Sequence, residues 1–380
     1  MGVYAMMERV KRGPDRVDIE ELDPGDRLPP AVTGGYITKI DRLDPGDVGL
    51  FAAGMTMGLV EPKEEEITAE QRAWLTGFYN QFSNVLHGAN FRDPLTGYRA
   101  YIDVEEWIDH HLLNVLAKNV DALRLSTYMH IPREGRLTMG PIWDFDRSMG
   151  SYDGRDADPY TWNGTGDATR YFEYPWWQRL FQDPDFWDQY IARWQELRRG
   201  PLSNANIHAT IDAMRDELQE AQVRNFERWP EVAPTRVADW QGEIDWLKTW
   251  LAQRADWMDS QFPATPQAVP GSGIVEPGTQ VKLSAPSGVV YYTADGSDPR
   301  LPGGEISPDA IAISWVSDWT TILSAGSNWR YWDLGYAPPN NWIRLDFDHT
   351  SWAYGAAELG YGDNQVTEIS YGPNPSDKYP

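Results

Sequence analysis

Three aspartates and one asparagine in a short stretch of the sequence have types and spacing that suit metal-assisted chemistry. Asn119 and Asp121 precede a run of alternating residues, and Asp144 and Asp146 follow it. Carboxylate and amide oxygens suit Mg²⁺, which usually takes one or two carboxylates and completes its shell with water and substrate phosphate. Phosphoryl transfer needs such a clamp and a group that orients the attacking hydroxyl. The pattern is therefore a candidate magnesium site.

A helix and a β-hairpin must bring these side chains together. An N-cap pattern at Asp103–Glu106 precedes apolar residues at helical spacing, which predicts an amphipathic helix of about four turns. Residues 123–130 alternate as a strand, and residues 137–143 form a plausible return strand. Because strands of similar length bring the chain back to the level it left, the carboxylates of Asp121 and Asp144 are expected to converge.

An alternative interpretation of the same residues needs no metal. Aspartate and asparagine are favoured at helix ends and turns, so a cluster of them beside a hairpin is often only capping. Spacing alone leaves both interpretations open. The core Trp143-Asp144-Phe145-Asp146, with Gly140-Pro141 before it and Gly150 after it, carries further information.

Several short motifs in a fixed order resemble the spore coat protein H (CotH) kinase-like family. Together they span most of the first 260 or so residues, and their order makes the resemblance specific. The motifs are Met1-Gly2-Val3-Tyr4, Glu8-Arg9-Val10-Lys11-Arg12, Arg16-Val17-Asp18-Ile19, Thr33-Gly34-Gly35-Tyr36-Ile37, Asn119-Val120-Asp121-Ala122, Ser126-Thr127-Tyr128, Gly135-Arg136-Leu137 and Gly140-Pro141-Ile142-Trp143-Asp144-Phe145-Asp146.

The resemblance implies an α+β, atypical protein-kinase-like fold. It also implies a reaction in which ATP and Mg²⁺ (or Mn²⁺) phosphorylate Ser or Thr of a protein substrate. By position, Asp121 resembles the catalytic-loop aspartate, with Asn119 beside it. Asp144 resembles the metal-binding aspartate of an Asp-Phe-Gly triplet, and Asp146, the third residue here, would add a second metal ligand.

Part of the nucleotide-binding lobe is expected to be missing, because the chain starts inside what resembles a Tyr-x-Gly-Val-Tyr strand of the family. A kinase needs a phosphate-covering loop and usually a lysine paired with a glutamate. Glu8, Lys11 and Lys39 are the candidate nucleotide-binding residues, although each taken singly also fits a solvated surface charge. An inactive fragment of an active kinase is one expectation that follows.

The composition shifts to linker character at residues 263–273, which are rich in Pro, Gly and Ala. The string Tyr291–Pro299 resembles the immunoglobulin-like module at the C-terminal side of chitobiases, and the aromatic-rich end resembles a β-sandwich of the jelly-roll kind. We therefore expect a kinase-like domain at 1–263 that lacks its first part, an immunoglobulin-like module at 264–310 and a partial β-sandwich at 311–380.

Composition limits the partners. A net charge of -24 disfavours nucleic acid and anionic membrane surfaces. The sequence has no cysteine, so it forms no disulfide and does no thiol chemistry. It also has no apolar run long enough for a membrane-spanning helix.

Three functions remain open from the sequence. The first is a bacterial, secreted or envelope-associated protein kinase whose β modules contact glycan or the cell surface. The second is a non-catalytic coat or surface scaffold with glycan-binding modules. The third, a glycoside hydrolase, is suggested only by the chitobiase-type module, and an appended module does not set the chemistry of its neighbour.

Overall fold

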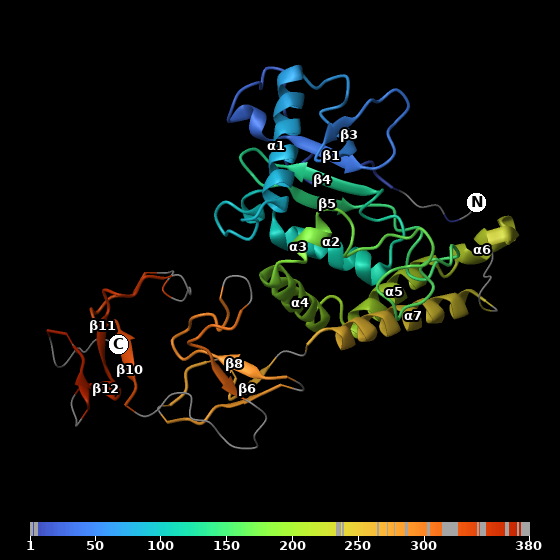
Figure 1. The fold of residues 1–380 in the computed structure, drawn as a ribbon. Helices are drawn as coiled ribbons and strands as arrows, with labels where there is room; N and C mark the ends of the chain where they lie inside the picture. The colour runs from blue at the N-terminus through green and yellow to red at the C-terminus, as the bar shows by residue number, and fades with distance from the viewer. Residues whose placement is uncertain are drawn as a thin grey trace. The chain divides into compact units, whose positions relative to one another are not determined.

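The computed structural model divides the chain into two compact units, Met1–Phe262 and Pro263–Pro380. Figure 1 shows the helices and strands of both. Most of the motif Met1-Gly2-Val3-Tyr4, with the strand expected there, lies outside the described residues. The described residues are 3, 7–232, 237, 239–263, 266–271, 273–276, 278–285, 288–301, 305–313, 326–339, 342, 347–361, 365–370 and 372–373.

The first unit is built on a five-stranded antiparallel sheet with the order β2-β3-β1-β4-β5. The predicted hairpin is confirmed as β4 and β5, but its first strand starts at Thr127. Leu123 and Ser126 have φ angles of 68° and 52°, so residues 123–126 form a turn, because left-handed backbone does not continue a strand. The strands are β1 (Tyr36–Ile40), β2 (Leu50–Ala52), β3 (Met55–Glu61), β4 (Thr127–Ile131) and β5 (Thr138–Ile142).

One face of the sheet packs on α1 (Ala69–His87), whose first turn is fixed by a capping box between Thr68 and Gln71. Tyr79 of this helix is fully buried, and its hydroxyl lies 2.6 Å from the Thr38 hydroxyl on β1. The helix and the sheet are therefore joined by a buried hydrogen bond as well as by apolar packing.

The predicted helix after Asp103 is confirmed as α2 (Val104–Ala117), and the Asp103 carboxylate accepts the N–H of Glu106 at 3.2 Å. Figure 1 shows α2 between the sheet and a lower layer of α4, α5 and α7. Buried tryptophans such as Trp107 and Trp177 fill the interior between these helices. The later helices are α3 (Trp177–Leu180), α4 (Pro184–Arg199), α5 (Asn204–Leu218), α6 (Ala221–Arg228) and α7 (Trp240–Gln261), and 3-10 turns lie at Ala31–Thr33, Tyr98–Ala100 and Pro230–Val232.

The opposite face of the sheet is covered by the N-terminal segment. Val17 and Ile19 pack there against Ile37 of β1 and Tyr128 of β4. Lys39 pairs with Tyr128 across the β1–β4 ladder, so the two side chains point to the same face. This face carries the candidate nucleotide-binding lysine.

Gly34 is required for packing. A Cβ at this position would overlap the backbone of Arg133 in the β4–β5 turn. The Thr33 hydroxyl accepts the N–H of Glu134 in the same turn at 3.0 Å. The Thr33-Gly34 part of the motif therefore seats the hairpin against β1.

The second unit consists of short paired strands. The immunoglobulin-like and sandwich assignments, and the boundary between them, stay predictions. None of the described helices combines the length and the apolar character needed to cross a bilayer. The strand pairs are β6 (Gln267–Val269) with β7 (Lys282–Ser284), β8 (Val290–Tyr292) with β9 (Ile311–Ile313), β10 (Asn328–Tyr331) with β11 (Ala353–Ala356), and β12 (Leu359–Gly360) with β13 (Thr367–Glu368).

Candidate active site

The candidate site lies where α2 ends and the β4–β5 hairpin begins and ends. Lys118 follows α2 in left-handed conformation, with φ at 51°, and its side chain is buried. Its Nζ donates to the carbonyl oxygen of Asp158 at 2.6 Å and to the hydroxyl of Thr161 at 2.8 Å. Burial lowers the pKa of Lys118 to about 8. The catalytic-loop candidate thus begins at a residue that is fixed by buried contacts.

Backbone hydrogen bonds join the segment before the hairpin to the segment after it. The N–H of Met149 donates to the carbonyl oxygen of Ala117 at 2.6 Å. The N–H of Val120 donates to the carbonyl oxygen of Arg147 at 3.2 Å. The two segments therefore lie side by side, as the hairpin geometry predicted.

Asn119 links the two candidate aspartate positions. Its side-chain nitrogen donates to the carbonyl oxygen of Asp144 at 3.2 Å, and its side-chain oxygen accepts the N–H of Asp121 at 3.3 Å. Its own carbonyl accepts the hydroxyl of Tyr171 at 2.7 Å. Asn119 is buried, so it holds the two backbones in a fixed relation, and its catalytic role stays a prediction.

Asp144 and Asp146 form a pair of carboxylates at the end of the hairpin. Asp144 has a φ of 60°, a strained conformation of the kind that clusters at functional sites. The Ser126 hydroxyl donates to its Oδ2 at 3.2 Å. Desolvation, followed by the negative charge of Asp146, raises the pKa of Asp144. This pair carries an excess of negative charge that a cation would neutralise.

Asp121 is held by arginines. Nη2 of Arg124 lies 2.6 Å from its Oδ1, and Nη1 of Arg147 lies 3.6 Å from its Oδ2. The Asp121 side chain keeps 18% of its surface exposed. The structure thus brings Asp121 to the site but pairs it with two cations.

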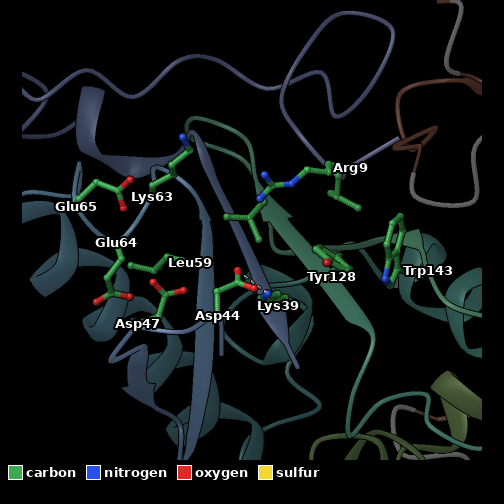
Figure 2. A pocket seen from close by; sticks show the side chains of 12 residues that line it. Arg9, Lys39, Asp44, Asp47, Leu59, Lys63, Glu64, Glu65, Tyr128 and Trp143 are labelled. Atoms are coloured by element: carbon green, nitrogen blue, oxygen red, sulfur yellow. Dashed lines mark hydrogen bonds and ion pairs between the residues drawn. The ribbon is translucent and has the colours of Figure 1, made fainter. Parts of the chain in front are cut away.

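A cavity of about 370 Å³ lies beside Trp143, the residue directly before Asp144. Small-molecule sites fall in the range of roughly 300–1,000 Å³. Figure 2 shows Tyr128 and Trp143 at one end of the cavity, while Arg9 reaches in from the N-terminal segment. The cavity therefore combines aromatic surface with a basic side chain, while Asp121, Asp144 and Asp146 are not among its lining residues.

Lys39 lines the same cavity. Its side chain is largely buried, and its Nζ lies 3.3 Å from Oδ2 of Asp44. Lys63 is a further basic lining residue, and Figure 2 shows Glu64 and Glu65 at the end away from Trp143. The lining thus mixes the three bases with four acids, Asp44, Asp47, Glu64 and Glu65, and an anion bound there would have to contact the arginine and lysine side chains directly.

The other two candidate nucleotide-binding residues lie outside the cavity lining. Nζ of Lys11 is 2.5 Å from Oε1 of Glu8, and Arg16 also pairs with Glu8. The residues of this segment that line the cavity are Arg9 and Val10. Glu8 and Lys11 thus do not line the cavity, and their assignment to nucleotide binding stays a prediction.

Comparison with known families decides the relationship. The family model described as CotH kinase protein matches residues 1–258. The chain belongs to the CotH kinase family. A search of curated proteins found no match. The CotH kinase match confirms the resemblance seen in the short motifs, and it ends before the region that resembles the chitobiase-type module.

The donor set of this CotH kinase-family site fits a divalent cation held by a carboxylate pair. Among the described residues, no three acidic or histidine side chains are close enough to share one metal ion. The expected cluster of three acids is therefore reduced to Asp144 and Asp146, with Asp121 held by arginines. Mg²⁺ needs only one or two protein carboxylates when water and phosphate complete its shell, so the pair suffices.

Sequence reasoning missed the basic residues of the CotH kinase site. Arg124 and Arg147, which hold Asp121, were not predicted, nor was Arg9 at the cavity. Trp143 stood inside the predicted motif but was given no role. Its position before Asp144 was a usable signal, because a residue next to a hairpin carboxylate must lie at the same end of the sheet.

Proposed function

We propose that this chain belongs to a secreted or envelope-associated protein kinase that transfers the γ-phosphate of ATP to Ser or Thr hydroxyls of a protein. The observation that carries the proposal is the Asp144–Asp146 carboxylate pair, which directly follows Trp143, a residue that lines the same cavity as Lys39. Membership of the CotH kinase family supports it. A divalent cation bound at the pair supplies the positive charge that phosphoryl transfer requires.

Different residues of the cavity bind different parts of the nucleotide. Lys39, Arg9 and Lys63 contact the phosphates, since charge-assisted hydrogen bonds from cations are the strong ones. Tyr128 and Trp143 offer aromatic surface on which a base can stack.

Asp121 orients the acceptor hydroxyl. Its carboxylate is partly exposed and keeps lone pairs that the arginine contacts do not use. Protein phosphorylation relies on positioning and charge more than on a strong base, so an arginine-paired aspartate still suits the task. A carboxylate that accepts the hydroxyl hydrogen bond fixes the direction of attack.

A non-catalytic scaffold is the second candidate, and the pairing of Asp121 with Arg124 and Arg147 favours it. In that case the second unit would provide attachment to glycan or the cell surface. The scaffold would have no reason to bind a metal–nucleotide complex. Nucleotide binding therefore separates the two functions.

The test is the substitution Asp144→Ala in the full chain. With millimolar ATP and Mg²⁺, the wild type is expected to unfold at a higher temperature, since a ligand at 100 times its Kd contributes about 2.7 kcal/mol. Asp144→Ala should lose this shift and the transfer of labelled γ-phosphate, while unfolding normally without nucleotide. Asp18→Ala, an exposed acid in the N-terminal segment, is the control that keeps both.

Two results would contradict the proposal. Unchanged transfer of labelled phosphate by Asp144→Ala would remove the metal role of this carboxylate. If ATP and Mg²⁺ do not raise the unfolding temperature of the wild-type chain, even at concentrations well above a millimolar, the scaffold is favoured.

A further inference from the structure

The guanidinium of Arg147 lies among three carboxylates, those of Asp121, of the adjacent Asp146 and of Asp153 in the same loop. Its Nη1 is 3.6 Å from Oδ2 of Asp121, and its Nε is 4.0 Å from Oδ2 of Asp146 and 3.9 Å from Oδ2 of Asp153. Close charge-assisted hydrogen bonds measure about 2.7–2.9 Å. These longer contacts hold the group by charge alone, and its side chain is 51% exposed.

Neighbouring arginines are bound differently. Arg124 lies 2.6 Å from Oδ1 of Asp121, and Arg155 contacts Asp153 at 2.5 Å and 2.7 Å. These short bonds fix the geometry of both carboxylates without help from Arg147. The Arg147 side chain is therefore free to shift toward another anion at little cost to the acids that it contacts.

The backbone of Arg147 is anchored even though its side chain is not. Its carbonyl accepts the N–H of Val120, and the adjacent Asp146 belongs to the carboxylate pair of the candidate metal site. A flexible cation thus extends from a fixed point between Asp121 and the metal position. A transferring phosphoryl group would pass through this region.

We propose that Arg147 neutralises the carboxylates of the free site and binds the nucleotide phosphates once a metal–nucleotide complex is in place. This inference rests on the proposed function, because it needs the Asp144–Asp146 pair to bind a divalent cation. Arg147 then weakens the binding of one ligand and strengthens the binding of another. The positive charge repels a bare metal ion and attracts a metal–ATP complex, whose net charge is negative.

These opposite effects can be measured without any turnover. Mn²⁺ alone and Mn²⁺ with a non-hydrolysable ATP analogue are titrated into the full chain, with Mn²⁺ followed by electron paramagnetic resonance. Arg147→Gln should bind Mn²⁺ about threefold more tightly, a modest effect because the side chain is half-exposed. The same variant should bind the Mn²⁺–nucleotide complex about tenfold more weakly, since a charge-assisted contact to phosphate is lost.

Matched variants separate this role from a structural one. Arg147→Lys keeps the charge and should restore wild-type affinity for Mn²⁺ alone. Arg170→Gln removes another exposed arginine, paired with Glu173 at 3.1 Å, and should change neither affinity. Thermal unfolding of each variant without ligand confirms that it is folded.

The outcomes are distinct for the two proposals. If Arg147→Gln shifts both affinities in the same direction, or shifts neither, while Asp144→Ala abolishes Mn²⁺ binding, the role of Arg147 is wrong and the metal site stands. If Asp144→Ala binds Mn²⁺ as well as the wild type does, or the wild type binds none, the metal site is wrong and the role of Arg147 falls with it.

Discussion

Lys39 is the residue on which nucleotide affinity should depend most directly. The side chain is 8% exposed, and lysine is rarely buried so far unless it is paired. Lys39→Met keeps most of the stem and removes the charge. Because hydrogen bonds to charged groups contribute about 1.5–3 kcal/mol, we expect affinity for ATP with Mg²⁺ to fall tenfold or more. Isothermal titration calorimetry measures this directly.

Lys11→Met is the matched control for this prediction. Lys11 is half-exposed, pairs with Glu8 and lies outside the cavity lining. We expect its loss to leave nucleotide affinity within about twofold of wild type, since exposed ion pairs contribute little. Equal losses in the two lysine variants would mean that the cavity is not the nucleotide site.

At the residue scale, the sequence predicted the acids better than the bases. The side chains of Asp144 and Asn119 are short and act close to their own backbone, so a motif that fixes the backbone position also fixes where these groups lie, while their catalytic and metal-binding roles stay predictions. Arg147 was missed because the contact of its long side chain with Asp121 depends on tertiary packing, which brings positions 121 and 147 together. Spacing along the chain contains no signal for such contacts.

At the element scale, the turn that precedes β4 is stabilised by one side chain. The Thr127 hydroxyl accepts the N–H of Leu123 at 2.8 Å and donates to the carbonyl of Leu125 at 2.9 Å. Thr127→Val keeps the shape and leaves a buried N–H unpaired. We expect the free energy of unfolding to fall by about 1–3 kcal/mol, measured by urea denaturation.

The control for the turn is Thr138→Val on the partner strand. The Thr138 hydroxyl donates to the carbonyl of Arg136 at 3.2 Å near the surface, so its loss should cost no more than about 0.5 kcal/mol. A Thr127→Val protein as stable as wild type would show that the turn needs no hydroxyl. In that case the left-handed residues Leu123 and Ser126 would need another explanation.

The elements themselves were largely predictable, because their signals are local. The cap at Asp103 and the hairpin of β4 and β5 follow from patterns of a few residues. Residues 123–126 were wrongly predicted as strand because their alternation mimics one, while the Thr127 hydroxyl and the contacts to α2 select a turn. The periodicity of the sequence cannot show that a turn is more stable than a strand at these residues.

At the scale of the whole molecule, composition predicted two kinds of structure but not their detail. The change at residues 263–273 coincides with the boundary between the units Met1–Phe262 and Pro263–Pro380. The net charge of -24 did not predict a cavity lined by Arg9, Lys39 and Lys63. An average over the chain does not show where individual charges of either sign lie, and this cavity is lined by four acids as well as three bases.

The first unit should lose stability in mild acid through its buried histidines. His110 and His111 of α2 are 5% and 0% exposed, and burial lowers their pKa values to about 4 and about 3. Unfolding restores the ordinary value near 6.5, so the unfolded chain binds more protons below that pH. The free energy of unfolding therefore falls as pH drops from about 6.5 toward 4, by up to about 1.4 kcal/mol per pH unit for each histidine.

Substitution of either histidine should reduce the slope of the free energy of unfolding against pH between about 6.5 and 4. This holds whatever the substitution does to stability at neutral pH. His111 contacts the Tyr190 hydroxyl and several rings, so His111→Gln will also lower stability at pH 7. His110→Gln is the milder variant. The side-chain contact of the His110 ring is a long one, 3.5 Å to Nδ2 of Asn114, so its loss should cost less. Urea denaturation from pH 7 to 4 measures each slope, with the exposed His87→Gln on α1 as the control. A wild-type slope retained in both buried variants would place the proton uptake on other groups, because each substitution removes one site that can bind a proton only after unfolding.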